Sequence, residues 1–180
     1  FQAHGADASG AVIFRRKLRR DQVLAFFASQ PRCLVAMEAC AGGHYWAREI
    51  GALGHEIRLI PPAYVKPFVK RQKNDMADAE AICEAALRPT MRFVTPKSAE
   101  AQAAATVFRT RDLLVRQRTQ LINALRGHLA EFGIVVRKGV ENTPELIAYV
   151  DDPRSDLPRE ARSILEVLVQ TLQLLQAKIK

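Results

Sequence analysis

Two aspartates three residues apart, Asp75 and Asp78, are the side chains in this sequence best suited to chemistry. They follow Asn74, a favoured N-cap residue, so we expect both in the first turn of a helix and on one side of it. Two like charges held there repel each other unless a cation lies between them. Mg²⁺ is bound by one or two carboxylates plus substrate phosphates, so the pair suits half of a metal site. A simpler explanation is an acidic helix N-terminus stabilised by the helix dipole.

The helix that carries this pair is expected to run to Leu87 and to bury one face. Apolar residues recur along it at helical spacing and predict a buried stripe made of Met76, Ala79, Cys83 and Ala86. Asp75, Asp78 and Ile82 run along one flank of this stripe. We therefore expect both carboxylates at the edge of the packed surface.

A third carboxylate, Glu38, ends a predicted strand. Residues 33–37 form a continuous apolar run typical of a strand buried on both faces. A tight loop then leads into a predicted helix over about 45–53, and residues 55–60 supply a second strand. This pattern predicts a βαβ unit, and ligands of open α/β sheets collect at the carboxyl ends of strands. Glu38 is therefore either a ligand-facing carboxylate or a strand-terminal charge that reaches solvent.

Basic residues precede the aspartate pair and line the polar face of a long helix. Aromatic residues separate the cations that precede the pair, which are Lys66, Lys70, Arg71 and Lys73. A helix predicted from Thr95 to Phe132 has a basic polar face made of Arg109, Arg111, Arg116, Arg118 and Arg126. A phosphodiester substrate needs such cations, because its backbone must be neutralised while a metal acts on one phosphate. An exposed linker and a solvated helix face are the alternatives.

The remaining patterns predict a hairpin at the start of the chain and packed helices at its end. Residues 1–14 suggest two strands around a turn, and residues 21–29 a short helix. The long helix repeats apolar residues every seven positions at Phe108, Val115, Ile122 and Leu129. After a connecting tip over 134–156, a last helix carries the heptad seam Ala161, Leu165, Leu168, Leu172, Leu175 and Ile179. The two helices predict an antiparallel hairpin or a dimerising arm.

Composition narrows the class of protein. The chain has 180 residues, 48% of them hydrophobic, and a formal net charge of +8. This charge favours a polyanionic partner, with nucleic acid as the first expectation, and no apolar run is long enough to span a bilayer. The three cysteines have no metal-ligand spacing and no secretory signal opens the sequence, so we expect a cytoplasmic protein.

Three segments in order, residues 37–42 (Met-Glu-Ala-Cys-Ala-Gly), 66–68 (Lys-Pro-Phe) and 73–79 (Lys-Asn-Asp-Met-Ala-Asp-Ala), carry a family resemblance. With them and the long arginine-rich helix, the chain resembles the DEDD-type transposases of the insertion-sequence 110 family, relatives of which are guided by a bridge RNA. The resemblance implies a RuvC-like, RNase H-type α/β domain over 1–95, lacking its first strand, and a helical coiled-coil region over 96–180.

The resemblance also implies roles for individual residues. In that family an Asp, a Glu and an Asp-x-x-Asp pair bind divalent metal, so Glu38, Asp75 and Asp78 would be the second, third and fourth acidic residues, holding Mg²⁺ or Mn²⁺. The partners implied are DNA, a structured guide RNA and further copies of the chain, as a dimer or tetramer through the helical region.

Two parts of the family pattern are not matched. The first Asp of the family would fall upstream of Phe1. The family also has a domain after the coiled coil, with a serine that resembles a covalent nucleophile toward DNA. We therefore expect this chain to be a fragment that is inactive alone. Two other functions stay open: a RuvC-like Holliday junction resolvase or nuclease that uses metals to activate water, and a non-catalytic nucleic-acid-binding coiled-coil module.

Overall fold

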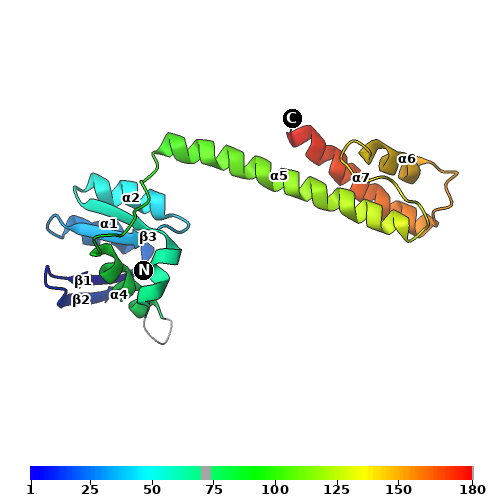
Figure 1. The fold of residues 1–180 in the computed structure, drawn as a ribbon. Helices are drawn as coiled ribbons and strands as arrows, with labels where there is room; N and C mark the ends of the chain where they lie inside the picture. Colours follow the sequence, from blue (N-terminus) through cyan, green and yellow to red (C-terminus); the bar gives the residue numbers. More distant parts are fainter. Residues whose placement is uncertain (70–73, 180) are drawn as a thin grey trace. The chain divides into compact units, whose positions relative to one another are not determined.

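A computed structural model describes residues 1–69 and 74–179 of the chain. The chain divides into two compact units, Phe1–Ala101 and Gln102–Lys180 (Figure 1).

The first unit opens with the predicted hairpin, which the structure confirms. Strand β1 (Gln2–Ala6) pairs antiparallel with β2 (Val12–Lys17), so the second strand extends three residues beyond the predicted end. The Asp7 carboxylate closes the turn by accepting hydrogen bonds from the backbone N–H groups of Ser9 and Ala11 and from the Ser9 hydroxyl. These bonds, that of the Ser9 hydroxyl first, lower the pKa of Asp7. The Phe14 ring lies directly against Gly5, where a Cβ atom would be 2.2 Å from a ring carbon.

The predicted βαβ unit is also confirmed. Strand β3 (Leu34–Glu38) leads through α2 (Gly43–Ala52) to β4 (Glu56–Ile60), and the two strands pair in parallel with Glu38 opposite Ile60. Gly42 adopts a φ of 85° at the N-cap of α2, a conformation that favours glycine. A 3-10 turn η1 (Arg20–Gln22) and helix α1 (Val23–Ala28) pack with α2 on one face of these strands, around a core of Leu18, Val23, Val35, Trp46 and Ile50.

The other face of the β3–β4 sheet is covered by α3 (Pro62–Val65), the 3-10 turn η2 (Lys66–Phe68) and α4 (Asp75–Ala86). The predicted buried stripe of α4 is only partly correct. Ala86 is buried as predicted, but Met76 is 46% exposed and Ala79 and Cys83 are half-buried, while Ala81 and Ala85 are fully buried. The physical reason is close approach, because two methyl groups let the helix backbone lie nearer the sheet than a methionine side chain would.

The strands form two small sheets, where a single mixed sheet was expected. Among the described residues, β1 pairs only with β2, and β3 only with β4 apart from an isolated bridge between Leu59 and Val94. The hairpin joins the unit through side chains instead, since Ala3 packs against the α1–α2 core. Helix α4 also lies beside β1 (Figure 1). The architecture is mixed α/β, as predicted.

The second unit is built from α5 (Ala99–Ala130), α6 (Thr143–Asp151) and α7 (Arg159–Ile179). Helix α5 begins later than predicted, because Arg48 and His44 bind the backbone of Lys97 and the Ser98 hydroxyl accepts from the Ala101 N–H, so Ser98 is the cap. The helix α6 lies inside the segment predicted as a connecting tip. The prolines of that segment concealed it, although Pro144 in a first helical turn is favourable.

Only the last turns of α5 bury the predicted apolar stripe. The core of the unit gathers residues of all three helices and the connections: Ile122, Leu125, Leu129, Val136, Leu146, Val150, Leu157, Leu165, Val169 and Leu172. Leu165 and Leu172 of the predicted α7 seam are therefore covered within the chain. Phe108, at the other end of the α5 stripe, is 72% exposed.

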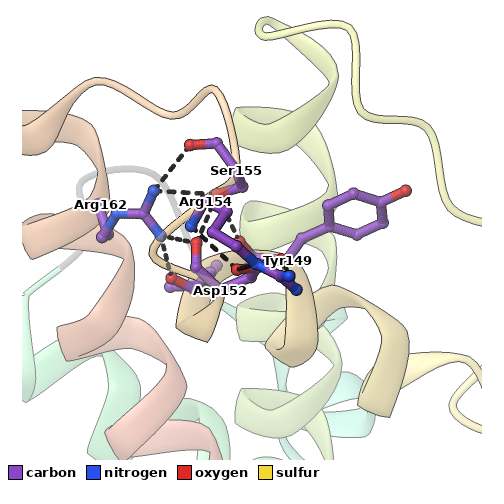
Figure 2. Close-up of polar contacts among 6 residues, drawn as sticks. Tyr149, Asp152, Arg154, Ser155 and Arg162 are labelled. Carbon is purple, nitrogen blue, oxygen red and sulfur yellow. Dashed lines mark hydrogen bonds and ion pairs between the residues drawn. The ribbon is translucent and has the colours of Figure 1, made fainter.

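The connection from α6 to α7 is tied down by one arginine (Figure 2). The Arg162 guanidinium donates to the carbonyls of Val150 and Ser155, at 2.9 Å each, to the carbonyl of Asp152 and to the Ser155 hydroxyl. This hydroxyl in turn donates to the carbonyl oxygens of Tyr149 and Asp152. Carbonyls at a helix C-terminus lack intrahelical partners, so the arginine caps α6 from the first turns of the next helix.

Candidate metal-binding and nucleic-acid-binding residues

The predicted cap of the acidic helix is present. The Asn74 side-chain oxygen accepts hydrogen bonds from the N–H groups of Met76 at 3.1 Å and Ala77 at 2.9 Å. Asp75 and Asp78 both lie in the first turn of α4, where Asp75 is exposed and Asp78 half-buried. The sequence therefore located the start of this helix correctly.

The burial of α4 shows which side Asp78 occupies. Ala81 and Ile82, three and four residues after it, pack in the cluster that contains Ala36 of β3 and Ile60 of β4. Residues three and four apart share one side of a helix, so Asp78 lies one turn before the residues that contact the sheet. Asp75 lies one turn earlier still, at the open end of the helix.

Strand alternation places Glu38 on the same side of the sheet. Val35 and Met37 belong to the core on the α1–α2 face, whereas Ala36 belongs to the cluster beneath α4. Alternate residues of a strand point to the same face, so Glu38 shares the α4 face with Ala36. It is half-buried at the carboxyl end of β3.

A hydrogen bond fixes the other end of α4. Arg58, two residues before the end of β4, donates from Nη1 to the carbonyl of Ala86, the last residue of α4, at 3.0 Å. With a rise of about 1.5 Å per residue, Asp78 is about 12 Å along the helix axis from Ala86. The acidic turn is therefore at the end of α4 remote from Arg58.

The chemistry of these three carboxylates fits a hard divalent cation, which prefers oxygen ligands. Their spacing is wider than a closed site requires: within residues 1–69 and 74–179, no three His, Cys, Asp or Glu side chains form a group that could hold a metal ion. The metal-binding roles of Glu38, Asp75 and Asp78 therefore stay a prediction.

The predicted cations before the aspartate pair are described only in part. Lys66 is exposed in η2, while Lys70, Arg71 and Lys73 lie outside the described residues. Arg88 and Arg92, just after α4, were not among the predicted contacts, although they are exposed beside Tyr64 and Phe68. Two arginines flanking a proline turn were the signal available in the sequence.

The arginines of α5 differ in how much of their charge faces solvent. Arg109 and Arg111 are exposed, and Arg116, also exposed, forms a 2.9 Å ion pair with Asp112. Arg118 is half-buried. The Arg126 guanidinium is occupied within the chain.

Arg126 donates to the Asn123 side chain at 3.3 Å and to the carbonyls of Arg137 at 3.1 Å and Gly139 at 3.3 Å. These bonds hold the segment after α5 against the helix. Arg126 thus has an evident structural role, whereas the nucleic-acid-binding roles of the arginines on α5 stay a prediction.

Within residues 1–69 and 74–179, none of the helices combines the length and the hydrophobicity of a membrane-spanning segment.

Comparison with known proteins identifies the family. A family model named for DEDD transposases of the IS110 type and described as "Transposase" matches residues 1–134. The chain is 51% identical over 182 residues to a "Probable family 20 transposase" of Pseudomonas aeruginosa, covering 99% of this chain and 54% of that protein. It is 46% identical over 181 residues to the "Putative transposase y4pF/y4sB" of Sinorhizobium fredii, covering 100% of this chain and 46% of the relative.

A third relative is the "Transposase for insertion sequence element IS1328" of Yersinia enterocolitica, 47% identical over 140 residues, which cover 78% of this chain and 42% of the relative. No solved structure matches the chain. The chain spans about half the length of these curated relatives. The match of the family model to residues 1–134 and the identity to named transposases agree with the resemblance in the acidic motifs, and the chain therefore belongs to the family of IS110-type DEDD transposases.

Proposed function

We propose that this chain supplies the carboxylates of a DNA transposase, with Glu38, Asp75 and Asp78 holding Mg²⁺ or Mn²⁺ for phosphodiester chemistry. The observation that carries the proposal is that Glu38 and the sheet-contacting side of α4 share one face of the β3–β4 sheet. The DEDD transposase family generally uses divalent metal ions, and a RuvC-like arrangement gathers such carboxylates at the carboxyl ends of strands.

Each part of the chain then has a defined task. A bound divalent ion would polarise the scissile phosphate and stabilise the charge that develops on its oxygens. The Asn74 cap fixes the first turn of α4 and so orients Asp75 and Asp78, while the end of the β3 ladder fixes Glu38. In the whole protein, a serine beyond residue 180 would act as the covalent nucleophile toward DNA.

The proposed partners are DNA, a structured guide RNA and further copies of the chain, in the cytoplasm. The net charge of +8 and the exposed Arg109 and Arg111 favour contact with nucleic-acid phosphates. A dimer or tetramer through the helical region is supported by apolar side chains that α5 and α7 leave exposed, which are Val107, Phe108, Leu113, Ile164, Val167 and Leu174.

The test is recombination by the full-length protein. We expect Asp75→Ala, Asp78→Ala and Glu38→Ala each to abolish recombination while DNA affinity is retained, because the carboxylates hold the metal and repel phosphate in its absence. Asp151→Ala, an exposed carboxylate at the end of α6, is the matched control and should recombine normally.

Metal binding is measured separately from activity. In a Mn²⁺ titration followed by electron paramagnetic resonance, the three variants should leave more of the hydrated-ion signal than the wild type or Asp151→Ala. An Asp75→Ala protein that still recombines at the wild-type rate contradicts the proposal.

A further inference from the structure

We propose that the hollow between η2 and the turn after α4 is a subsite for one nucleotide of a single-stranded nucleic acid, either DNA or RNA. The inference rests on the proposed function for its ligand class. The site itself is distinct from Glu38, Asp75 and Asp78, none of which lines it.

The hollow is open to solvent and large enough to hold one small planar group. Its volume is about 560 Å³, within the usual range for small-ligand sites. Phe68 and Met91 provide apolar walls that pack against the cluster beneath the β3–β4 sheet. Two arginines, Arg88 and Arg92, and a second aromatic ring, that of Tyr64, lie at its edge.

Two prolines hold the walls in place before any ligand arrives. Pro67 lies in the first turn of η2, whose neighbour Val65 is buried. Pro89 lies in a turn closed by a 3.1 Å hydrogen bond from the Met91 N–H to the Arg88 carbonyl. Because proline fixes its own φ angle, both walls lose little conformational freedom on binding, and such preorganisation favours affinity.

The charge of the hollow selects an anion. The Arg88 guanidinium lies over the Phe68 ring, 5.4 Å from its centroid, and forms an ion pair with Glu84 on α4. Arg92 is exposed and, among the described residues, has no carboxylate within ion-pair distance. None of the described lining residues is acidic, so the hollow carries a net positive charge.

The aromatic rings select a planar group next to that anion. Tyr64 is 43% exposed, although a tyrosine ring buries most of its surface when a core can accept it. Bases of single strands stack on exposed aromatic rings, and arginines beside them bind the adjoining phosphate. A base together with its phosphate meets both requirements, whereas an inorganic anion leaves the rings unused.

The position of the hollow relates it to the proposed chemistry. Helix α4 has the acidic turn at its N-terminus, and Arg88 follows its C-terminus by two residues. Both lie on the same face of the β3–β4 sheet as Glu38. A nucleic-acid strand bound in the hollow would thus be anchored about one helix length, roughly 18 Å, from Asp75.

The test measures equilibrium binding of the full-length protein to fluorescein-labelled single strands, one of DNA and one of RNA with the same sequence. Tyr64→Leu should weaken binding of at least one strand by roughly 5- to 150-fold, the range for loss of one stacked base. Arg92→Gln should lower the slope of log affinity against log salt by about 0.7, the value for one phosphate contact of a single strand. The strand type that responds identifies the ligand as DNA or RNA.

A third probe isolates stacking from charge. On an abasic strand of the same length, Tyr64→Leu should bind like the wild type, because no base is left to stack, while Arg92→Gln should remain weaker. Two matched controls lie in the same unit: Tyr45→Leu, at a tyrosine of α2 that is 39% exposed, and Arg32→Gln, at an exposed arginine before β3. Both should leave affinity unchanged.

If Tyr64→Leu binds both normal strands with wild-type affinity, the subsite is refuted. Binding does not require the metal chemistry, so this result would leave recombination by the wild type, and its loss in Asp75→Ala, unaffected. Conversely, an Asp75→Ala protein that recombines would refute the proposed chemistry without changing the effect of Tyr64→Leu on strand binding.

Discussion

Removal of the Arg162 side-chain bonds should destabilise the second unit more than any comparable change at its surface. Arg162→Met keeps most of the aliphatic stem but removes four hydrogen bonds to the end of α6 and the loop after it. Hydrogen bonds to a charged group contribute about 1.5–3 kcal/mol each when isolated, but these acceptors share one donor group and water reaches some of them. We therefore expect a loss of about 2–4 kcal/mol in the free energy of unfolding.

The neighbouring arginine supplies the control. Arg154 bonds the Asp152 carboxylate at 3.1 Å, but its side chain is 88% exposed, and exposed ion pairs contribute about 0–1 kcal/mol. Arg154→Met should therefore change stability little, although it also removes one positive charge beside the α6–α7 connection (Figure 2).

Native-state hydrogen exchange of the purified protein is the appropriate assay, because it resolves the two units. Amides of α6 and α7 should lose protection in Arg162→Met, while amides of β3 and β4 should not. Equal protection of α6 in the Arg162→Met and Arg154→Met proteins would refute the reasoning.

Two further predictions concern the β1–β2 hairpin. Gly5→Ala should lower the stability of the first unit by about 1–3 kcal/mol, because the new Cβ atom would meet the Phe14 ring. Thermal unfolding measures this loss. The double variant Gly5→Ala/Phe14→Leu should recover part of it. The folded protein holds the pKa of Asp7 below its ordinary value of 3.8. The ionised carboxylate therefore stabilises the folded state fully above pH 3.8, and this stabilisation is lost as the pH falls through the lowered pKa of the folded state. In Asp7→Asn, the free energy of unfolding should therefore fall less steeply with pH below about pH 4. Urea unfolding at several pH values measures this dependence. If the free energy of unfolding falls as steeply in Asp7→Asn as in the wild type, the hydrogen bonds of the turn do not cause the pH dependence.

Local signals in the sequence were sufficient for several elements. Asn74 identified the start of α4 because a cap is a contact between near neighbours in the chain. The apolar run before Glu38 and the glycine loop after it likewise identified the βαβ unit.

Features that depend on distant contacts were not predictable in this way. The alanine-rich α4 has small residues on several sides, so its pattern does not specify which side meets the sheet, and Met76 was assigned to the wrong one. The candidate site shares this limit. The sequence identifies Glu38, Asp75 and Asp78 as candidate ligands by their residue types and their order. It does not specify the distances between their carboxylates, because these distances depend on how closely α4 approaches β3.

The fully buried alanines of α4 have a consequence for genetics. Ala81 and Ala85 bear no polar atom in their side chains, yet any larger residue at either position must displace the helix whose first turn holds Asp75 and Asp78. A saturation library of the full-length gene should therefore return loss-of-activity alleles at these two codons, with little besides glycine tolerated. Such alleles would resemble lesions of the acidic residues in phenotype while leaving every carboxylate in place.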